Sequence, residues 1–220
     1  MRLRVFPHEM GYSRRIGHSE IGVWGISGSG SREADRRTFI RRILAAYCGL
    51  PLDDVVLHSA GPKARPTLAL EPPIDLSFNL SHSGSWTLLA VTQGVHVGVD
   101  IEQIRTGVRI DRLARRFFSE VEVTALRSIA DEARETAFFH TWVRKEAYLK
   151  AVGAGVGVPA GLGRFSVSIG TDEPPAVLAT DLEPGGVSAF SLYDLDVPEG
   201  YAGALAVKGT GHRIRYRSPS

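Results

Sequence analysis

The chain has 220 residues, 43% of them hydrophobic and 23% charged, with a formal net charge of +2. These values are typical of globular proteins with a buried core, and the small net charge argues against bulk affinity for nucleic acid. The single cysteine, Cys48, excludes an intrachain disulfide framework and a multi-cysteine metal site. The first residues contain no apolar run of the signal-peptide kind, and no stretch has the length of a transmembrane helix. We therefore expect a cytoplasmic protein without nucleic-acid or membrane partners.

The first half of the chain alternates short apolar segments with turn signals, which predicts strands around one helix. That helix, Arg32–Cys48, follows a Gly/Ser loop and carries Arg32, Arg36 and Arg37 near its start. A helix start of this kind can bind a phosphate, but a solvated basic face also explains the pattern, and this feature alone favours the solvated face. The other predicted elements are a lead-in over residues 1–20, strands at Ile21–Ile26, Val55–His58, Asp75–Leu80 and Trp86–Thr92, a basic turn at Gly61–Pro66 and a polar turn at Ser81–Gly84.

The segment Gly94–Glu102 alternates apolar and polar residues, which predicts a half-buried strand. Asp100 and Glu102 fall on the polar side, so their carboxylates point the same way. Two neighbouring carboxylates repel and raise each other's pKa, and a divalent cation such as Mg²⁺ relieves the conflict. Two solvated acids at the end of a strand are the alternative. The apolar side consists of Val95, Val97, Val99 and Ile101.

The second half begins with a linker over Gln103–Gly107 and a basic, aromatic helical segment over Arg109–Phe118. This segment suits an acidic partner protein, or it is an amphipathic helix whose aromatic rings belong to the core. Ser119 and Glu122 match a capping box at the start of a further helix, and Asp131–Arg134 predicts its end. The remaining predictions are strands at Arg164–Ile169, Ala176–Ala179, Val187–Asp194 and Ala202–Lys208 and a basic, frayed tail over Gly209–Ser220.

The strongest helical pattern runs from Glu135 to Val152, and it places Glu146 and Lys150 within an apolar stripe. An unpaired charge on a buried face is costly, so such groups are paired, bind a metal or take part in chemistry. An internal Glu146–Lys150 pair is the structural alternative to a functional role. The apolar members of the stripe are Phe139, Trp142 and Val143.

Three segments together resemble the motifs of the 4′-phosphopantetheinyl transferases, and the match is closest to the long, surfactin-synthetase-activating type. They are Phe78-Asn-Leu-Ser-His-Ser-Gly84, Gly98-Val-Asp-Ile-Glu102 and Trp142-Val-Arg-Lys-Glu-Ala-Tyr-Leu-Lys150. The segment Arg116-Phe-Phe-Ser-Glu-Val-Glu122 fits between the last two. The order and spacing agree over roughly residues 20–208, so the resemblance covers most of the chain.

The resemblance implies an α+β fold, a pseudo-dimer of two similar halves (residues 1–98 and 99–208) with the active site in the cleft between them. It also implies a monomer that binds coenzyme A with Mg²⁺. By matched position, the metal ligands are Asp100, Glu102 and Glu146, and the catalytic residues are Glu146 and Lys150. The matched coenzyme A ligands are Arg32, Arg65, Ser81, His82 and Lys150. Glu122 also matches an acid of the family, in competition with its capping role.

The implied reaction moves the 4′-phosphopantetheine arm of coenzyme A to a serine of an apo acyl or peptidyl carrier protein and releases 3′,5′-ADP. Docking of the acidic carrier falls to the basic aromatic segment, with Arg112, Leu113, Arg116, Phe117 and Phe118 as contacts. Two alternatives remain open at this point. One is a non-catalytic module that binds coenzyme A or carrier protein, and the other is a metal-dependent nucleotide hydrolase.

Overall fold

The computed structural model describes residues 16–28, 33–58, 66–69, 74–153, 159–171 and 173–217. Its first half contains β1 (Glu20–Ser27), α1 (Glu33–Cys48), η1 (Leu52–Asp54), β2 (Leu57–His58), β3 (Thr67–Leu68), β4 (Leu76–Ser83) and β5 (Trp86–Gln93). Next come β6 (Val97–Gln103), α2 (Ile110–Phe117), α3 (Glu120–Ser128) and α4 (Asp131–Val152). The remainder comprises η2 (Pro159–Arg164), β7 (Phe165–Val167), β8 (Val177–Thr180), η3 (Gly186–Ala189), β9 (Phe190–Asp194), β10 (Tyr201–Lys208) and β11 (Arg213–Arg217).

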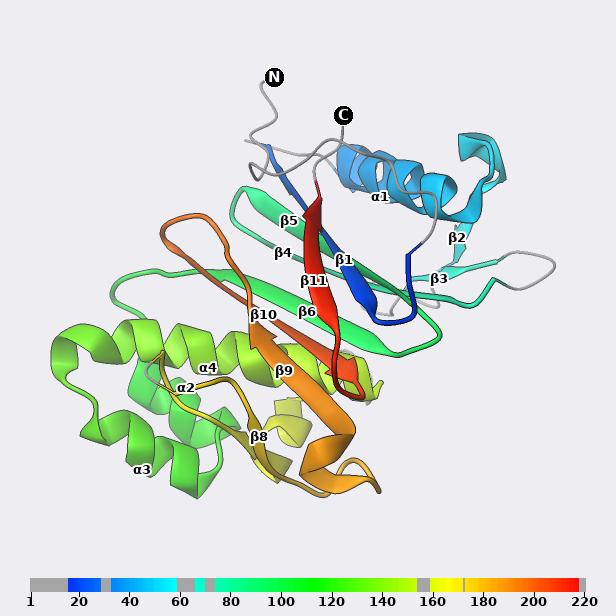
Figure 1. Ribbon diagram of the computed structural model, residues 1–220. Helices are drawn as coiled ribbons and strands as arrows, with labels where there is room; N and C mark the ends of the chain where they lie inside the picture. The colour runs from blue at the N-terminus through cyan, green and yellow to red at the C-terminus, as the bar shows by residue number, and fades with distance from the viewer. Residues whose placement is uncertain are drawn as a thin grey trace.

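Two sheets stack face to face, and a long helix covers each outer side, α1 on one and α4 on the other (Figure 1). The first sheet has the strand order β11-β1-β5-β4 and the second β6-β10-β9. Successive side chains of a strand point to opposite faces. Val23 of β1 therefore enters the core between the sheets, while Trp24 packs toward α1. The predicted α+β fold is confirmed, and the pseudo-dimer of two similar halves stays a prediction.

Strand β6 is buried on both faces over residues 97–101, whereas the sequence pattern predicted a half-buried strand. Its valines and Ile101 pack between the two sheets, and its other face lies against α4. Gly98 permits this contact, because a Cβ there would overlap the backbone of Ala147 and Ala151 and lie 2.9 Å from Lys150 Cβ. The close approach of α4 to β6 brings Lys150 beside the carboxylate-bearing end of the strand.

The polar turn predicted at Ser81–Gly84 is wrong for its first three residues. Ser81, His82 and Ser83 continue β4 and pair with Leu88, Thr87 and Trp86 of β5. Only Gly84 and Ser85 form the hairpin turn, and Gly84 has φ +55°, which favours glycine. The serines are thereby held on a rigid strand instead of a loop.

Two further boundaries differ from prediction. Helix α4 begins at Asp131, so the predicted break over Asp131–Arg134 is its first turn. The negative charge of Asp131 is favourable at a helix start, and its carboxylate pairs with Arg134 at 2.6 Å. The tail predicted to be frayed contains β11, which pairs in parallel with β1 (Glu20 with Arg213). The last strand therefore joins the first sheet. The whole of β6 belongs to the second sheet, and a division of the chain between residues 98 and 99 stays a prediction.

No helix in the described part of the chain is both long enough and apolar enough to cross a membrane.

Candidate active site

The two predicted carboxylates of β6 lie at the edge of the second sheet, next to β4 at the edge of the first. Asp100 is 5% exposed, and its Oδ1 accepts from Lys150 Nζ at 2.7 Å and from the Ser81 hydroxyl at 2.6 Å. Lys150 Nζ also donates to the carbonyl oxygen of Val99 at 3.1 Å. Lys150 of α4 thus pairs with Asp100 of β6, a contact that the predicted internal pair with Glu146 did not include.

The second oxygen of Asp100, Oδ2, is buried and has no hydrogen-bond partner among the described residues. A buried carboxylate oxygen without a donor is costly, so this atom is suited to a ligand that the protein binds. A divalent cation meets that requirement, since Mg²⁺ prefers oxygen ligands.

Glu102 and Glu146 carry the electrostatic signature of crowded acids. Burial raises the pKa of Glu102, while the hydrogen bond from the Ser83 hydroxyl opposes this rise and the Asp100 charge adds to it. Burial, followed by the charge of Asp100, raises the pKa of Glu146 to about 7, although Lys150 acts in the opposite direction. The negative charge of Asp100 on β6 therefore raises the pKa of both Glu102 on the same strand and Glu146 on α4.

The described residues nevertheless contain no group of three or more His, Cys, Asp or Glu side chains arranged to hold a metal ion. The donor atoms fit Mg²⁺ in their chemistry, and Asp100 Oδ2 is the oxygen best placed for it. The complete set of Asp100, Glu102 and Glu146 as ligands stays a prediction. Arg32 and Arg65, predicted near the coenzyme A phosphates, lie outside the described residues.

A family model described as the 4′-phosphopantetheinyl transferase superfamily matches residues 96–206. Over 82% of its length, this chain is 34% identical to the 4′-phosphopantetheinyl transferase HetI of Nostoc sp., and the match covers 72% of that protein. The chain belongs to the 4′-phosphopantetheinyl transferase superfamily. This membership confirms the resemblance that the three sequence motifs indicated.

Other members of the superfamily are matched over shorter stretches. The chain is 36% identical to the 4′-phosphopantetheinyl transferase psf-1 of Bacillus pumilus, over 70% of this chain and 63% of that protein. It is 29% identical to the 4′-phosphopantetheinyl transferase Sfp of Bacillus subtilis, over 57% and 58% of the two chains. A solved holo-(acyl-carrier-protein) synthase from Bacillus anthracis, in complex with CoA (3′,5′-ADP), matches with a TM-score of 0.40 at 22% identity, over 53% and 98% of the two chains.

Glu122, which matches an acid of the superfamily, has a structural role in this member. Its Oε2 accepts from the backbone N–H of Ser119 at 2.7 Å and completes a capping box at the start of α3. Both carboxylate oxygens also accept from Lys145 Nζ, at 2.7 and 2.8 Å, and Oε1 accepts from the Val167 N–H. With every side of the carboxylate occupied and 1% of the residue exposed, Glu122 is a helix cap and ion-pair partner in this structure.

The predicted carrier-docking residues divide between surface and core. Arg112 and Arg116 are exposed on α2, and the guanidinium of Arg116 lies 5.0 Å above the ring of Phe117. Leu113 and Phe117 are half-buried against the core of the second half. Phe118 is 6% exposed and its ring stacks on Phe138 at 5.2 Å. The prediction of Phe118 as a docking contact is therefore wrong, because its ring belongs to the core.

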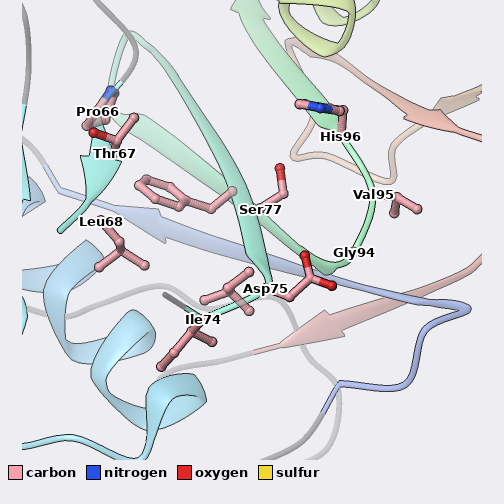
Figure 2. Close-up of a pocket in the computed structure, with 11 residues that line it drawn as sticks. Pro66, Thr67, Leu68, Ile74, Asp75, Ser77, Gly94, Val95 and His96 are labelled. Carbon is pink, nitrogen blue, oxygen red and sulfur yellow. The ribbon is translucent and has the colours of Figure 1, made fainter. Parts of the chain in front are cut away.

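A cavity of about 430 Å³ opens at the start of β4, at the opposite end of that strand from the carboxylates. Figure 2 shows Ser77 between the segment Pro66–Leu68 on one side and the loop Gly94–His96 on the other. Ser77 shares its side of β4 with Ser81 and Ser83, since alternate residues point the same way. The cavity and the two serines that contact the carboxylates of β6 therefore lie along one face of β4.

Asn79 and Ser83, which were not predicted as site residues, connect β4 to β6 at the site. Asn79 Oδ1 accepts from the Val99 N–H at 2.9 Å, and the Ser83 hydroxyl donates to Glu102. A signal was available for both: Ser77, Asn79, Ser81 and Ser83 recur every second residue, as do Asp100 and Glu102. Two matched polar alternations predict two strand edges that face each other.

Proposed function

We propose that this chain transfers the 4′-phosphopantetheine arm of coenzyme A to a serine of an apo acyl or peptidyl carrier protein. The products are the holo carrier protein and 3′,5′-ADP. Membership of the superfamily supports the reaction class. The observation that carries the proposal for this chain is the convergence of Asp100, Glu146 and Lys150 where the two sheets meet, with Asp100 Oδ2 buried and without a partner among the described residues.

In the proposed reaction, the serine oxygen of the carrier attacks the phosphorus atom that bears the pantetheine arm. The new P–O bond forms as the bond to the bridging oxygen of the pyrophosphate breaks, and 3′,5′-ADP leaves with that oxygen. Asp100, Glu102 and Glu146 would hold a Mg²⁺ ion. When bound, this ion supplies positive charge that stabilises the negative charge developing on the phosphates.

Side chains of the protein provide the proton transfers and the binding contacts. Glu146, partly buried on the same face of α4 as Lys150, accepts the serine proton in this proposal. Lys150, 13% exposed, lies within reach of the same centre and stabilises or protonates the leaving phosphate. The exposed His82 contributes a further phosphate contact, and Ser81 does so if its hydroxyl hydrogen turns away from Asp100.

We further propose that the nucleoside end of coenzyme A occupies the cavity at the start of β4. Leu68, Ile74 and Phe78 offer an apolar wall for a planar base, and Thr67, Ser77 and His96 offer hydrogen-bonding groups. The Ser77 and Ser81 positions are four residues apart on one strand, or about 13 Å, which is a reasonable span for the nucleotide half of coenzyme A. A Leu68→Trp variant, which fills the cavity, is expected to raise the Kd for 3′,5′-ADP in calorimetry. An unchanged Kd would place the nucleoside elsewhere.

The proposal is tested by intact-mass spectrometry of an apo carrier protein incubated with this protein, coenzyme A and Mg²⁺. We expect the carrier to gain the mass of one phosphopantetheine arm, and we expect EDTA or Asp100→Ala to abolish the gain. Glu132→Ala, which removes an exposed acid of the same fold, is the control and retains activity. Release of 3′,5′-ADP without carrier would favour a hydrolase. Coenzyme A binding without transfer to several classes of carrier would favour a binding module.

The basic surface of α2 is the proposed docking site for the carrier. Exposed Arg112 and Arg116 complement an acidic partner, and Leu113 with Phe117 supplies apolar contact at its base. We expect Arg112→Glu with Arg116→Glu to raise the KM for carrier about tenfold at low salt and to leave the KM for coenzyme A unchanged. Arg127→Glu with Arg213→Glu, at two exposed arginines outside α2, makes the same change in net charge and is the matched control. Equal effects of the two charge reversals would show that net charge, and not α2, guides the carrier.

A further inference from the structure

Strands β4 and β6 are joined by side chains, although they belong to different sheets. Asn79 accepts from the Val99 N–H, Ser81 donates to Asp100, and Ser83 contacts Glu102. The bonds advance together along both strands, so each of the two carboxylates of β6 faces its own serine of β4. Residues of the first half of the protein therefore orient the carboxylates that the second half carries.

The Ser83 hydroxyl group both donates and accepts a hydrogen bond at the end of β6. The hydroxyl donates to Glu102 Oε2 at 2.7 Å, and its oxygen accepts from the Gln103 N–H at 3.0 Å. Glu102 also forms an ion pair with Arg105, whose guanidinium lies 3.9 Å away and whose side chain is 63% exposed. A distant, solvated arginine orients a carboxylate weakly. Ser83 therefore provides the short, directional contact that fixes Glu102.

The hairpin tip that follows Ser83 is pressed onto the second half of the protein. A Cβ at Gly84 would lie 2.6 Å from Gln103 Oε1 and 2.6 Å from Tyr201 Oη. The Tyr201 hydroxyl accepts from the Ser85 N–H at 3.3 Å and lies 3.3 Å from Ser85 Oγ. Tyr201 of β10 thus holds the tip of the β4–β5 hairpin in the position from which Ser83 reaches Glu102.

We propose that Ser83 is a positioning residue, which orients the Glu102 carboxylate for a divalent cation, and that Tyr201 holds the hairpin that presents Ser83. This inference rests on the proposed function for the role of the cation. In this proposal, a residue of the first half of the chain positions a metal ligand that belongs to the second half. A purely structural role for the same hydrogen bonds predicts a loss of stability without a change in metal requirement.

The test compares Ser83→Ala with the wild-type protein in two measurements. In the transfer assay, we expect the half-saturating Mg²⁺ concentration to rise about tenfold, which is the usual loss when a partner of a metal ligand is removed. The KM for carrier stays within twofold. In calorimetry without any carrier, the Kd for Mg²⁺ in the presence of coenzyme A rises by the same factor.

Three further variants complete the test. Ser83→Thr keeps the hydroxyl and is expected to restore the wild-type Mg²⁺ requirement. Tyr201→Phe removes one hydroxyl from the tip and raises the requirement about threefold. Gln93→Ala, at the far end of β5 from the hairpin tip, stays within twofold and controls for general damage.

An unchanged Mg²⁺ requirement in Ser83→Ala, or failure of Ser83→Thr to restore it, overturns the role of Ser83. An unchanged requirement in Tyr201→Phe overturns the role of Tyr201. The outcome is separable from that of the proposed function. If the wild-type protein transfers nothing, the proposed function is wrong, and the calorimetric comparison of Mg²⁺ affinity still decides whether Ser83 orients Glu102.

Discussion

Replacing Lys145 with methionine is expected to lower the free energy of unfolding by about 3–5 kcal/mol, the usual cost of removing one partner of a buried ion pair. Lys145 is fully buried and Glu122 is 1% exposed. The substitution leaves the Glu122 carboxylate in the core with only the N–H groups of Ser119 and Val167 as donors. Urea unfolding monitored by circular dichroism measures the change.

A double-mutant cycle with Glu122→Gln separates the pair from the loss of either side chain. In the double variant Lys145→Met with Glu122→Gln, no uncompensated charge remains. We therefore expect its loss in free energy of unfolding to be smaller than the sum of the two single losses by about 2 kcal/mol or more. Arg164→Met is the matched surface control. Its pair with Asp181 spans 3.0 Å, but both side chains are more than half exposed, so the change costs less than about 0.5 kcal/mol. Strict additivity in the cycle would contradict a coupled buried pair.

Replacing Glu146 with glutamine is expected to stabilise the protein in EDTA, and by an amount that grows with pH. Burial and the neighbouring carboxylates raise the pKa of Glu146 from 4.5 to about 7 in the folded protein. Between these two values the folded state binds more protons than the unfolded state, so the free energy of unfolding falls as pH rises through this window. Below pH 4.5 the group is neutral in both states and the effect vanishes.

The difference between Glu146→Gln and wild type should therefore be near zero at pH 4.5 and reach about 2–3 kcal/mol at pH 8. Thermal unfolding across this pH range measures it, with Glu132→Gln, an exposed acid of the same helix, as control. A constant difference at all pH values would mean that Glu146 titrates normally. In the transfer assay the same variant should lose turnover much more than coenzyme A affinity, whereas equal losses would make Glu146 chiefly a ligand.

The sequence predicted most strands and the carboxylates, because their signals are local. Alternation identified β6, and the capping box at Ser119 and Glu122 is present in full. The burial of Arg144 and Lys145 was not predictable from α4 alone. Each charge is buried because a partner far along the chain meets it, Asp194 and Ser168 for Arg144 and Glu122 for Lys145. A helical pattern contains no information about those partners.

The same limit explains the errors in the site. Ser81–Ser83 resembles a turn in composition, but cross-strand pairing with β5 extends β4 over all three residues. Phe118 resembles a surface anchor beside arginines, but its ring fills the space next to Phe138. Lys150 was predicted at the site, but its contact with Asp100 depends on the close packing of α4 against β6 at Gly98. Tertiary contacts decide such cases over local preference.

Strand β11 has a consequence for how the protein is made. The first sheet is completed only when β11 pairs with β1, and the residues of the second half separate these two strands along the chain. During translation, β1, α1, β4 and β5 leave the ribosome before the second half has been synthesised. The edge of β1 that pairs with β11 stays uncovered during this time. Until then, β1 exposes unpaired backbone groups, which invite pairing with other chains. Expression yield should therefore depend on chaperones that shield the nascent first half, and a fusion partner placed directly after β11 should affect folding more than one placed on a surface loop.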